Sequence, residues 1–302
     1  MGEWMAKRFP YKVQKLSVDA GFTCPNRDGR LSTGGCIFCD NRTFNPKYCH
    51  PGLTVTQQIA AGKSFYAGKY PHMKYLVYFQ AFSNTYAPLH RLQEVYEEAL
   101  ETEDVAGIVV GTRPDCINED ILDYLEMLNR HAFVMVEYGI ESTLDQTLNA
   151  INRHHTFDCS RKAIEATHAR HIATGGHLII GLPGEDKQTI LDQAHTVSQL
   201  PLDVLKLHQL QIIRGTELER RYHAEPFPLM TLDEYVAFIA EYIRRLRPSL
   251  AIDRFVSQSP RHLLVAPRWG IKSQDFAQLL TTYMLKRGYF QGQTAITAAD
   301  GQ

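Results

Sequence analysis

Three cysteines lie close together in a glycine-rich segment near the start of the chain. The segment "CPNRDGRLSTGGCIFC" runs from Cys24 to Cys39, and Cys36 and Cys39 form a CxxC pair. Thiolates are soft ligands that suit zinc or iron–sulfur centres. Three thiolates without a fourth favour a [4Fe–4S] cluster in which one iron stays open for a further ligand. The glycines of the segment let the backbone pass close to such a cluster.

Two other interpretations of these cysteines stay open. Cys49 or His50 would complete a four-coordinate zinc site, although such a site is usually built from two CxxC-like turns. The protein would then be a zinc-stabilised, non-catalytic binding module. Alternatively, the cysteines are incidental in a barrel enzyme that needs no cofactor. That interpretation does not explain why the thiols gather in one segment.

The rest of the sequence alternates between apolar runs and amphipathic segments. The apolar runs predict six strands, over 12–20, 73–81, 105–113, 133–141, 173–183 and 203–212. Helices are expected over 54–70, 88–102, 118–131, 142–151, 157–170, 186–199 and 216–223. This alternation indicates an α/β fold with a parallel sheet. Six βα units favour a partial (β/α)6 barrel over a complete TIM barrel, with a doubly wound sheet as the alternative.

The pattern changes after residue 225, within the stretch "AEPFP" over 224–228. A helix is expected over 231–248 with Thr231 as its N-cap, because acidic residues occupy its first turn. A strand over 251–257 and a helix over 273–287 follow. We therefore expect a barrel core over 1–225, with the cysteine loop at 24–39, and a C-terminal α+β extension over 226–302 that packs on the barrel.

Polar residues gather where the expected strands end. They occur in the stretches "QAFSNTY" (80–86), "GTRPDC" (111–116), "EYGIES" (137–142), "GLPGE" (181–185) and "LHQLQIIRGT" (207–216). In βα barrels the loops after the strands build the active site at the carboxyl ends of the strands. These stretches and the cysteine loop are therefore expected to form one site.

The composition limits the classes to which this protein can belong. The 302 residues carry a formal net charge of −1, and 44% are hydrophobic, as in a globular protein with a sizeable core. No run of apolar residues is long enough to span a membrane. The N-terminus lacks the apolar core of a secretory signal, so we expect a cytoplasmic protein with reduced thiols. The near-neutral charge gives no support of its own for nucleic-acid binding.

Taken together, these motifs resemble the radical S-adenosylmethionine (SAM) superfamily. The resemblance covers about residues 8–270 and is carried by "GFTCPNRDG…GGCIFC", "YFQAFSNTY", "VGTRPDC", "GIES…INRHH", "LIIGLPGE" and "KLHQLQIIRGT". The superfamily's commonest cysteine spacing is C-x3-C-x2-C, whereas this chain has C-x11-C-x2-C. Long first spacings occur in the branch that resembles the elongator catalytic subunit, and the motifs look like those of its YhcC/YtqA-type proteins. The implied fold is the partial barrel of the radical SAM type.

The resemblance implies a role for each matching residue. Cys24, Cys36 and Cys39 would bind three irons of a [4Fe–4S] cluster, and SAM would chelate the fourth through its amino and carboxylate groups. The other implied SAM contacts are Phe38 near the adenine, Ser83, Asn84 and Thr85 on the amino group, Glu141 on the ribose, and Arg153 on the carboxylate. The "GLPGE" stretch would form a wall beside the adenine.

The resemblance also implies a reaction and partners. A reduced cluster would cleave SAM reductively, and the resulting 5′-deoxyadenosyl radical would abstract a substrate hydrogen. A flavodoxin- or ferredoxin-type protein would supply the electron. The elongator-like branch makes a tRNA base, such as a wobble uridine, the leading substrate; a free metabolite and a peptide are alternatives.

Each assignment also has an ordinary structural explanation. Glu141 and Ser142 could cap a helix, Arg153 could be a helix-end cation, and 83–85 has the composition of a turn. The pair Arg113 and Asp115 fits either a helix start or a substrate contact. For a second set of residues, core packing is favoured over a catalytic role of the histidines or an auxiliary cluster of the cysteines: His177, His208, Cys116 and Cys159. A last set could contact an anionic substrate or only solvent: Arg214, Arg261, His262 and Arg268.

Overall fold

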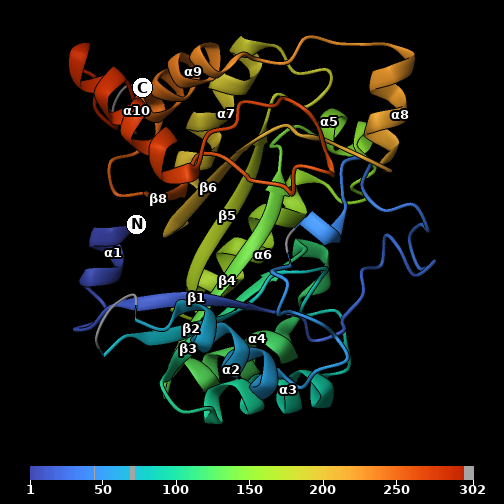
Figure 1. Cartoon of the computed structure of the whole chain (residues 1–302), viewed down its shortest axis with the longest axis vertical. Helices are drawn as coiled ribbons and strands as arrows, with labels where there is room; N and C mark the ends of the chain where they lie inside the picture. The colour runs from blue at the N-terminus through green and yellow to red at the C-terminus, as the bar shows by residue number, and fades with distance from the viewer. Residues whose placement is uncertain (44, 69–71, 296–302) are drawn as a thin grey trace. The chain divides into compact units, whose positions relative to one another are not determined.

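The computed structural model describes residues 1–43, 45–68 and 72–295. Its main sheet has seven strands in the order β1-β2-β3-β4-β5-β6-β8 (Figure 1). Their bounds are β1 Val13–Val18, β2 Lys74–Phe79, β3 Val105–Thr112, β4 Phe133–Glu141, β5 Ala173–Ile180, β6 Val204–Gln209 and β8 Ala251–Arg254. The pairings β1–β2, β2–β3, β3–β4 and β6–β8 are parallel.

The strand order decides between the two expected folds. A doubly wound sheet reverses its strand order at a switch point. Here the first six strands neighbour one another in sequence order, as in a βα barrel, so the expectation of a partial barrel is confirmed and the doubly wound alternative is wrong. The sheet has one strand more than expected, because β8 pairs with β6. The division at residue 225 stays a prediction.

The helices that connect the strands are those that the periodicity predicts. They are α2 Val55–Tyr66, α3 Leu89–Glu101, α4 Glu119–Asn129, α5 Asp145–Ala150, α6 Phe157–Ala169, α7 Lys187–Gln199, α8 Glu217–Ala224, α9 Leu232–Arg245 and α10 Ser273–Lys286, preceded by α1 Gly2–Ala6. Thr231 caps α9 in a capping box with Glu234, which confirms the predicted N-cap. Over the described residues, no helix is both long and apolar enough to cross a membrane.

One expected strand is divided in two. The apolar run over 203–212 forms β6, and the chain then leaves the main sheet at Leu210, whose N–H donates to the carbonyl of Ile180. The short strand β7, Ile212–Ile213, pairs antiparallel with β9, Leu264–Ala266. An apolar run cannot show this change of partner, because both pieces are buried.

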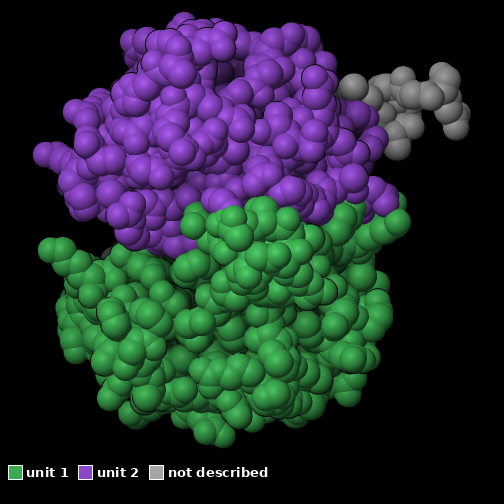
Figure 2. Space-filling model, turned by 90° about the vertical axis from the view of Figure 1, so that its right-hand side faces the viewer, with its two compact units in different colours: residues 1–33, 44–139, 159–175 green, residues 34–43, 140–158, 176–302 purple. Residues whose placement is uncertain are grey.

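The chain divides into two compact units, shown in different colours in Figure 2. Unit 1 comprises residues 1–33, 44–139 and 159–175; unit 2 comprises residues 34–43, 140–158 and 176–302. In unit 1 the buried ring of Tyr96 on α3 lies 5.1 Å from Phe79 and stacks at 6.5 Å on Tyr124. In unit 2 the ring of Tyr235 on α9 packs against Trp269 and Phe276. Such aromatic contacts hold each unit's helices in place.

Candidate cluster and cofactor site

The CxxC turn belongs to unit 2, and its second residue, Ile37, fastens it to the rest of that unit. The N–H of Cys39 donates to the carbonyl of Cys36 at 3.0 Å, which closes the turn. Between them, Ile37 donates to the carbonyl of Ile151 and accepts from the N–H of Leu218. The side chain of Ile37 is 4% exposed and lies in the same apolar cluster as these two residues. The apolar core therefore sets the direction of both thiols.

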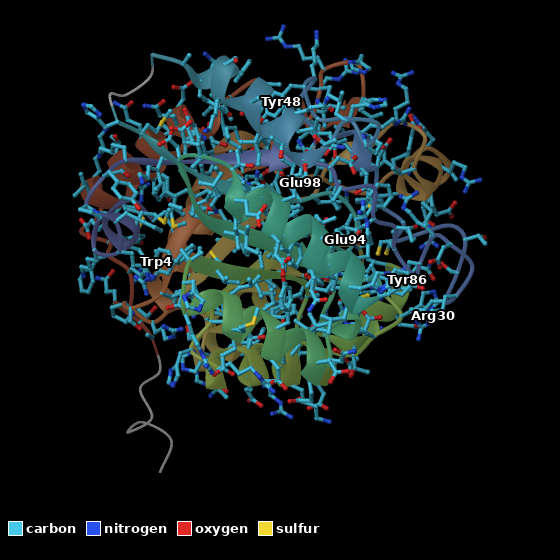
Figure 3. All side chains as sticks on the ribbon, turned by 90° about the horizontal axis from the view of Figure 1, so that it is seen from below. Trp4, Arg30, Tyr48, Tyr86, Glu94 and Glu98 are labelled. Atoms are coloured by element: carbon cyan, nitrogen blue, oxygen red, sulfur yellow. The ribbon has the colours of Figure 1, made fainter. Side chains whose placement is uncertain are left out.

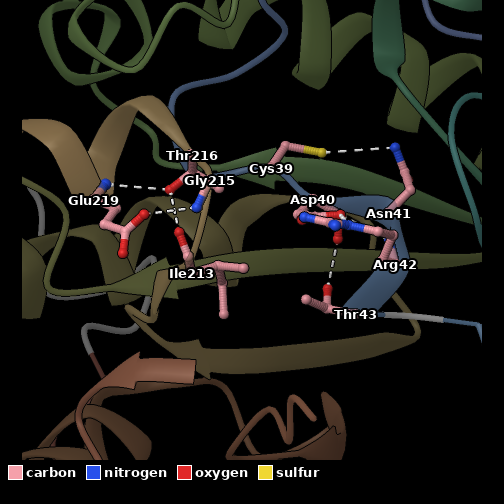
Figure 4. Close-up of polar contacts among 9 residues, drawn as sticks. All are labelled: Cys39, Asp40, Asn41, Arg42, Thr43, Ile213, Gly215, Thr216 and Glu219. Carbon is pink, nitrogen blue, oxygen red and sulfur yellow. Dashed lines mark hydrogen bonds and ion pairs between the residues drawn. The ribbon is translucent and has the colours of Figure 1, made fainter. Parts of the chain in front are cut away.

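Both sulfur atoms of this turn accept a hydrogen bond. Arg153 Nη1 lies 3.6 Å from Cys36 Sγ. Asn41 Nδ2 lies 3.9 Å from Cys39 Sγ, as Figure 4 shows. Groups that hydrogen-bond to ligand atoms orient metal ligands, so both cysteines have the surroundings of ligands. Their donor set fits an iron–sulfur cluster.

The segment after Cys39 holds Asn41 in place. The hydroxyl of Thr43 donates to the carbonyl of Asp40 at 2.7 Å, and the Arg42 guanidinium pairs with the Asp40 carboxylate (Figure 4). These contacts close a short 3-10 turn over Asn41–Thr43. No sequence pattern pointed to Asn41 as part of the site, because asparagine is common in any turn.

Glu141 and Arg153 come together beside Cys36. Glu141 is the last residue of β4 and has φ of +67°, which turns the chain sharply at the strand end. Its Oε1 lies 3.5 Å from Arg153 Nη2, and both side chains are largely buried. The neighbouring Asn152 donates from Nδ2 to the carbonyl of Gly35 at 2.7 Å. Three predicted site residues, Cys36, Glu141 and Arg153, are thus in contact.

A buried network fixes the turn that carries Glu141. The Ser142 hydroxyl donates to Glu185 Oε1 at 2.5 Å, and the Thr143 N–H donates to Gln193 Oε1 at 2.9 Å. Burial raises the pKa of the Glu185 carboxyl, and the hydrogen bond from Ser142 opposes that rise. Glu185 ends the "GLPGE" stretch, but nothing in the sequence pointed to Gln193 on α7.

The remaining SAM residues predicted in unit 2 line the same apolar cluster. Phe38 packs against the cluster that contains Ile37 and Leu182. Leu182 belongs to the "GLPGE" stretch, whose two glycines have φ of +91° and +88°. Only glycine adopts such values readily, so this loop turns tightly. Phe38 and the loop thus meet the same group of side chains.

Cys24 belongs to unit 1 and begins a compact loop. The N–H of Arg27 donates to the Cys24 carbonyl at 2.8 Å, and the N–H of Leu31 donates to the Pro25 carbonyl at 2.8 Å. The guanidinium of Arg30 lies over the ring of Tyr86, 5.7 Å from its centroid (Figure 3). These contacts fasten the loop to the segment that follows β2.

Ser83, Asn84 and Thr85 are buried in unit 1. Asn84 Nδ2 donates to the carbonyls of Phe79 and Gly111, at 3.0 and 2.7 Å. The Thr85 hydroxyl donates to the Cys116 carbonyl at 2.5 Å. These two side chains fasten the loop after β2 to the end of β3. Their predicted contact with SAM stays a prediction.

Cys49 and His50 do not support a zinc site. The Cys49 thiol donates to the Ser17 carbonyl at 2.8 Å, and burial raises its pKa to about 12. His50 accepts the Gly52 N–H at Nδ1. In the described part of the chain, no three His, Cys, Asp or Glu side chains gather closely enough for a single metal ion. Cluster thiolates bind separate irons, so they need not meet that condition.

The other strand-end residues form contacts of their own. Arg113 is 2% exposed and pairs with both carboxylate oxygens of Asp115, each at 2.8 Å. The Cys116 thiol lies 4.0 Å from Asp115 Oδ1, and burial raises its pKa to about 12. Cys159 lies on α6. The buried Arg113 thus has a carboxylate partner, as a structural residue at the strand mouth would.

Comparison with known families accounts for most of the chain. The sequence model of the radical SAM superfamily matches residues 26–197, more than half of the chain. A model of the radical SAM C-terminal domain matches residues 202–286.

Comparison with individual proteins gives relatives over almost the whole length. The chain is 32% identical over 289 residues to the uncharacterised protein YtqA of Bacillus subtilis, covering 96% of this chain and 90% of YtqA. It is 33% identical over 266 residues to YhcC of Escherichia coli, covering 88% and 85%. A tRNA uridine(34) acetyltransferase of Methanocaldococcus infernus is 25% identical, over 64% of this chain and 36% of its own length.

A solved structure shares the fold. The archaeal Elp3 of Methanocaldococcus infernus superposes with a TM-score of 0.67 at 17% identity, over 93% of this chain and 64% of that one. At this identity the likeness concerns the fold alone.

Proposed function

This chain belongs to the radical SAM superfamily, and we propose that it cleaves SAM reductively and abstracts a hydrogen atom from a substrate. It is a radical SAM enzyme, and its cofactors are a [4Fe–4S] cluster and SAM. The contact of Arg153 with both Cys36 and Glu141 carries the proposal. It joins a cluster ligand, a cation and a carboxylate in one buried place.

Cys24, Cys36 and Cys39 would hold the cluster. When bound, the cluster and SAM together supply an electron and a carbon radical that removes a hydrogen atom from the substrate. Arg153 and Asn41 would orient two of the sulfur atoms, because each donates an N–H group to one of them. The apolar cluster around Ile37 excludes water from the turn.

The proposed SAM contacts are those that the family resemblance implies. Arg153 would bind the methionyl carboxylate, because its planar guanidinium suits a carboxylate. Glu141 would accept from the ribose hydroxyls, and Phe38 would lie against the adenine. The loop of Ser83, Asn84 and Thr85 would face the methionyl amino group.

We propose a tRNA base as the substrate and a flavodoxin- or ferredoxin-type protein as the electron donor. The similarity to a protein named tRNA uridine(34) acetyltransferase supports the substrate. A single-electron donor is needed because radical SAM chemistry consumes an electron.

Formation of 5′-deoxyadenosine tests the reaction. The reconstituted protein is reduced with dithionite in the presence of SAM, and the product is quantified by chromatography. We expect product from the wild type and from Cys49→Ser, and none from Cys36→Ala. Cys49→Ser is the matched control, because it removes a buried thiol outside the cluster loop. Equal yields from Cys36→Ala and the wild type would contradict the proposal.

Stimulation of that product tests the substrate. Total tRNA, a peptide mixture and a small-molecule extract are added separately to the reduced enzyme with SAM. We expect tRNA alone to raise the yield of 5′-deoxyadenosine. Stimulation by either of the other two, without an effect of tRNA, would assign a different substrate class.

A further inference from the structure

A cluster of charged and imidazole side chains lies in unit 2, on strands β5, β6 and β8. The rings of His177 on β5 and His208 on β6 are 5.6 Å apart between centroids. Arg254, the last residue of β8, donates from Nη2 to His208 Nε2 at 3.0 Å. Strands of a parallel sheet are normally apolar on both faces, because both faces are covered. These residues depart from that pattern.

A bulge in β8 brings two consecutive side chains to this face. Leu205 pairs with Ile252, whereas Lys206 pairs with Arg254, so the register shifts by one residue between them. Lys206 and His208 are two residues apart on β6 and therefore share a face. Asp253 reaches Lys206 at 3.5 Å, while Arg254 reaches His208. The bulge thus turns both Asp253 and Arg254 toward one face, as bulges beside functional sites do.

The charges in the cluster do not cancel. The Lys206 ammonium pairs with the Asp253 carboxylate. Arg254 pairs with no carboxylate among the described residues, and its partner is an imidazole. Its Nε is buried and finds no hydrogen-bond acceptor in the described part of the chain. A half-buried guanidinium with an unsatisfied N–H requires an acceptor that these side chains do not provide.

The chemistry of the three residues defines the missing partner. A guanidinium only donates, so His208 must accept at Nε2 and be neutral. The excess positive charge therefore belongs to Arg254. Guanidinium groups bind carboxylates and phosphates in a bidentate manner, and imidazole N–H groups add donors beside them.

We infer that His177, His208 and Arg254 form a subsite for an anionic group of the substrate, a carboxylate or a phosphate. That the anion belongs to the substrate rests on the proposed function, whereas the presence of an anion site does not. A phosphate would suit a nucleic acid or nucleotide, and a carboxylate would suit an acidic metabolite or peptide.

Anion binding to the full chain with its reconstituted cluster tests the inference. Inorganic phosphate and acetate are titrated separately at constant ionic strength, with chloride as the balancing ion, and the thermal midpoint is followed. We expect one of the two to raise the midpoint saturably, because a ligand that binds only the folded state stabilises it. Arg254→Met should weaken that affinity by at least about tenfold. The anion that saturates identifies the group.

Two further variants keep the test decisive. Arg91→Met removes an exposed arginine on α3 that forms a salt bridge with Glu94, and this variant should bind like the wild type. If Arg254→Met does not fold, His208→Gln, which keeps a neutral polar side chain, should weaken binding several-fold. The inference would be overturned if neither anion stabilised the wild type saturably. It would also be overturned if the wild type and Arg254→Met bound the anion equally well.

The same preparation separates this inference from the proposed function. The EPR signal of the reduced wild-type protein is recorded with and without SAM. A signal that ignores SAM would overturn the proposed function and leave the anion measurement interpretable. A SAM-dependent signal without saturable anion binding would overturn only the subsite.

Discussion

The CxxC turn in unit 2 and the Ser83–Thr85 loop in unit 1 use their polar side chains differently. Around the turn, Arg153 and Asn41 direct N–H groups at sulfur atoms. In the loop, Asn84 and Thr85 direct their donors at backbone carbonyls. The donors around the turn orient the predicted cluster ligands, whereas the donors in the loop fix the backbone conformation. Polar composition at a strand end does not distinguish the two; the direction of each donor does.

Removing a thiol from the turn should have the largest effect. Cys39→Ala leaves two of the three cluster ligands, so we expect the protein to lose nearly all of its bound iron. Iron and sulfide analysis after anaerobic reconstitution measures this loss. Cys49→Ser should retain the full iron content. Iron retained by Cys39→Ala but lost by Cys49→Ser would reverse the assignment of the thiols.

Removing the cation beside the turn should come next. Arg153→Met removes the proposed carboxylate partner and leaves all cysteines, so we expect SAM affinity to fall about 30- to 100-fold, or about 2–3 kcal/mol. Titration of SAM into the reconstituted protein measures the affinity. Arg153→Lys should recover part of it. Unchanged affinity in Arg153→Met would remove Arg153 from the site.

In the loop of unit 1, the same comparison predicts a loss of stability. Asn84→Ala leaves the buried carbonyls of Phe79 and Gly111 without the amide donor. We expect the free energy of unfolding to fall by about 2 kcal/mol. Urea unfolding measures it. The loss of SAM affinity should be smaller than that of Arg153→Met, and a larger loss would make this loop a primary ligand site.

The buried thiol outside the turn should give the smallest effect, through pH. The folded-state pKa of Cys49 is about 12, above the ordinary value of 9.0. Its contribution to stability is therefore complete below pH 9 and is lost as the pH rises toward 12. Between pH 8 and pH 10 the wild type should lose more unfolding free energy than Cys49→Ser, by about 1.4 kcal/mol. Equal losses would mean that the thiol does not stay protonated.

Sequence patterns predicted the strand order, which the structure confirms, because apolar runs leave local traces. The three cysteine ligands also leave a local trace, and they stay a prediction. The spacing of Cys24, Cys36 and Cys39 and the apolar runs are visible along the chain. The Glu141–Arg153 pair was expected from motifs, and the structure places the two side chains 3.5 Å apart.

Other features depend on register and on distant partners. The bulge that turns Arg254 toward His208 exists only when β8 pairs with β6. Gln193 reaches the turn after β4 from the first half of α7, fifty residues away along the chain. Neither contact leaves a local sequence pattern, because hydrophobic periodicity shows that a residue is buried and not which residue it contacts.

EPR of the dithionite-reduced protein, with and without SAM, tests the central claim most directly. The account predicts a reduced [4Fe–4S] signal that changes when SAM is added, because SAM coordinates the iron that has no cysteine ligand. Zinc in place of iron after anaerobic purification, or a cluster signal that SAM leaves unchanged, would contradict it.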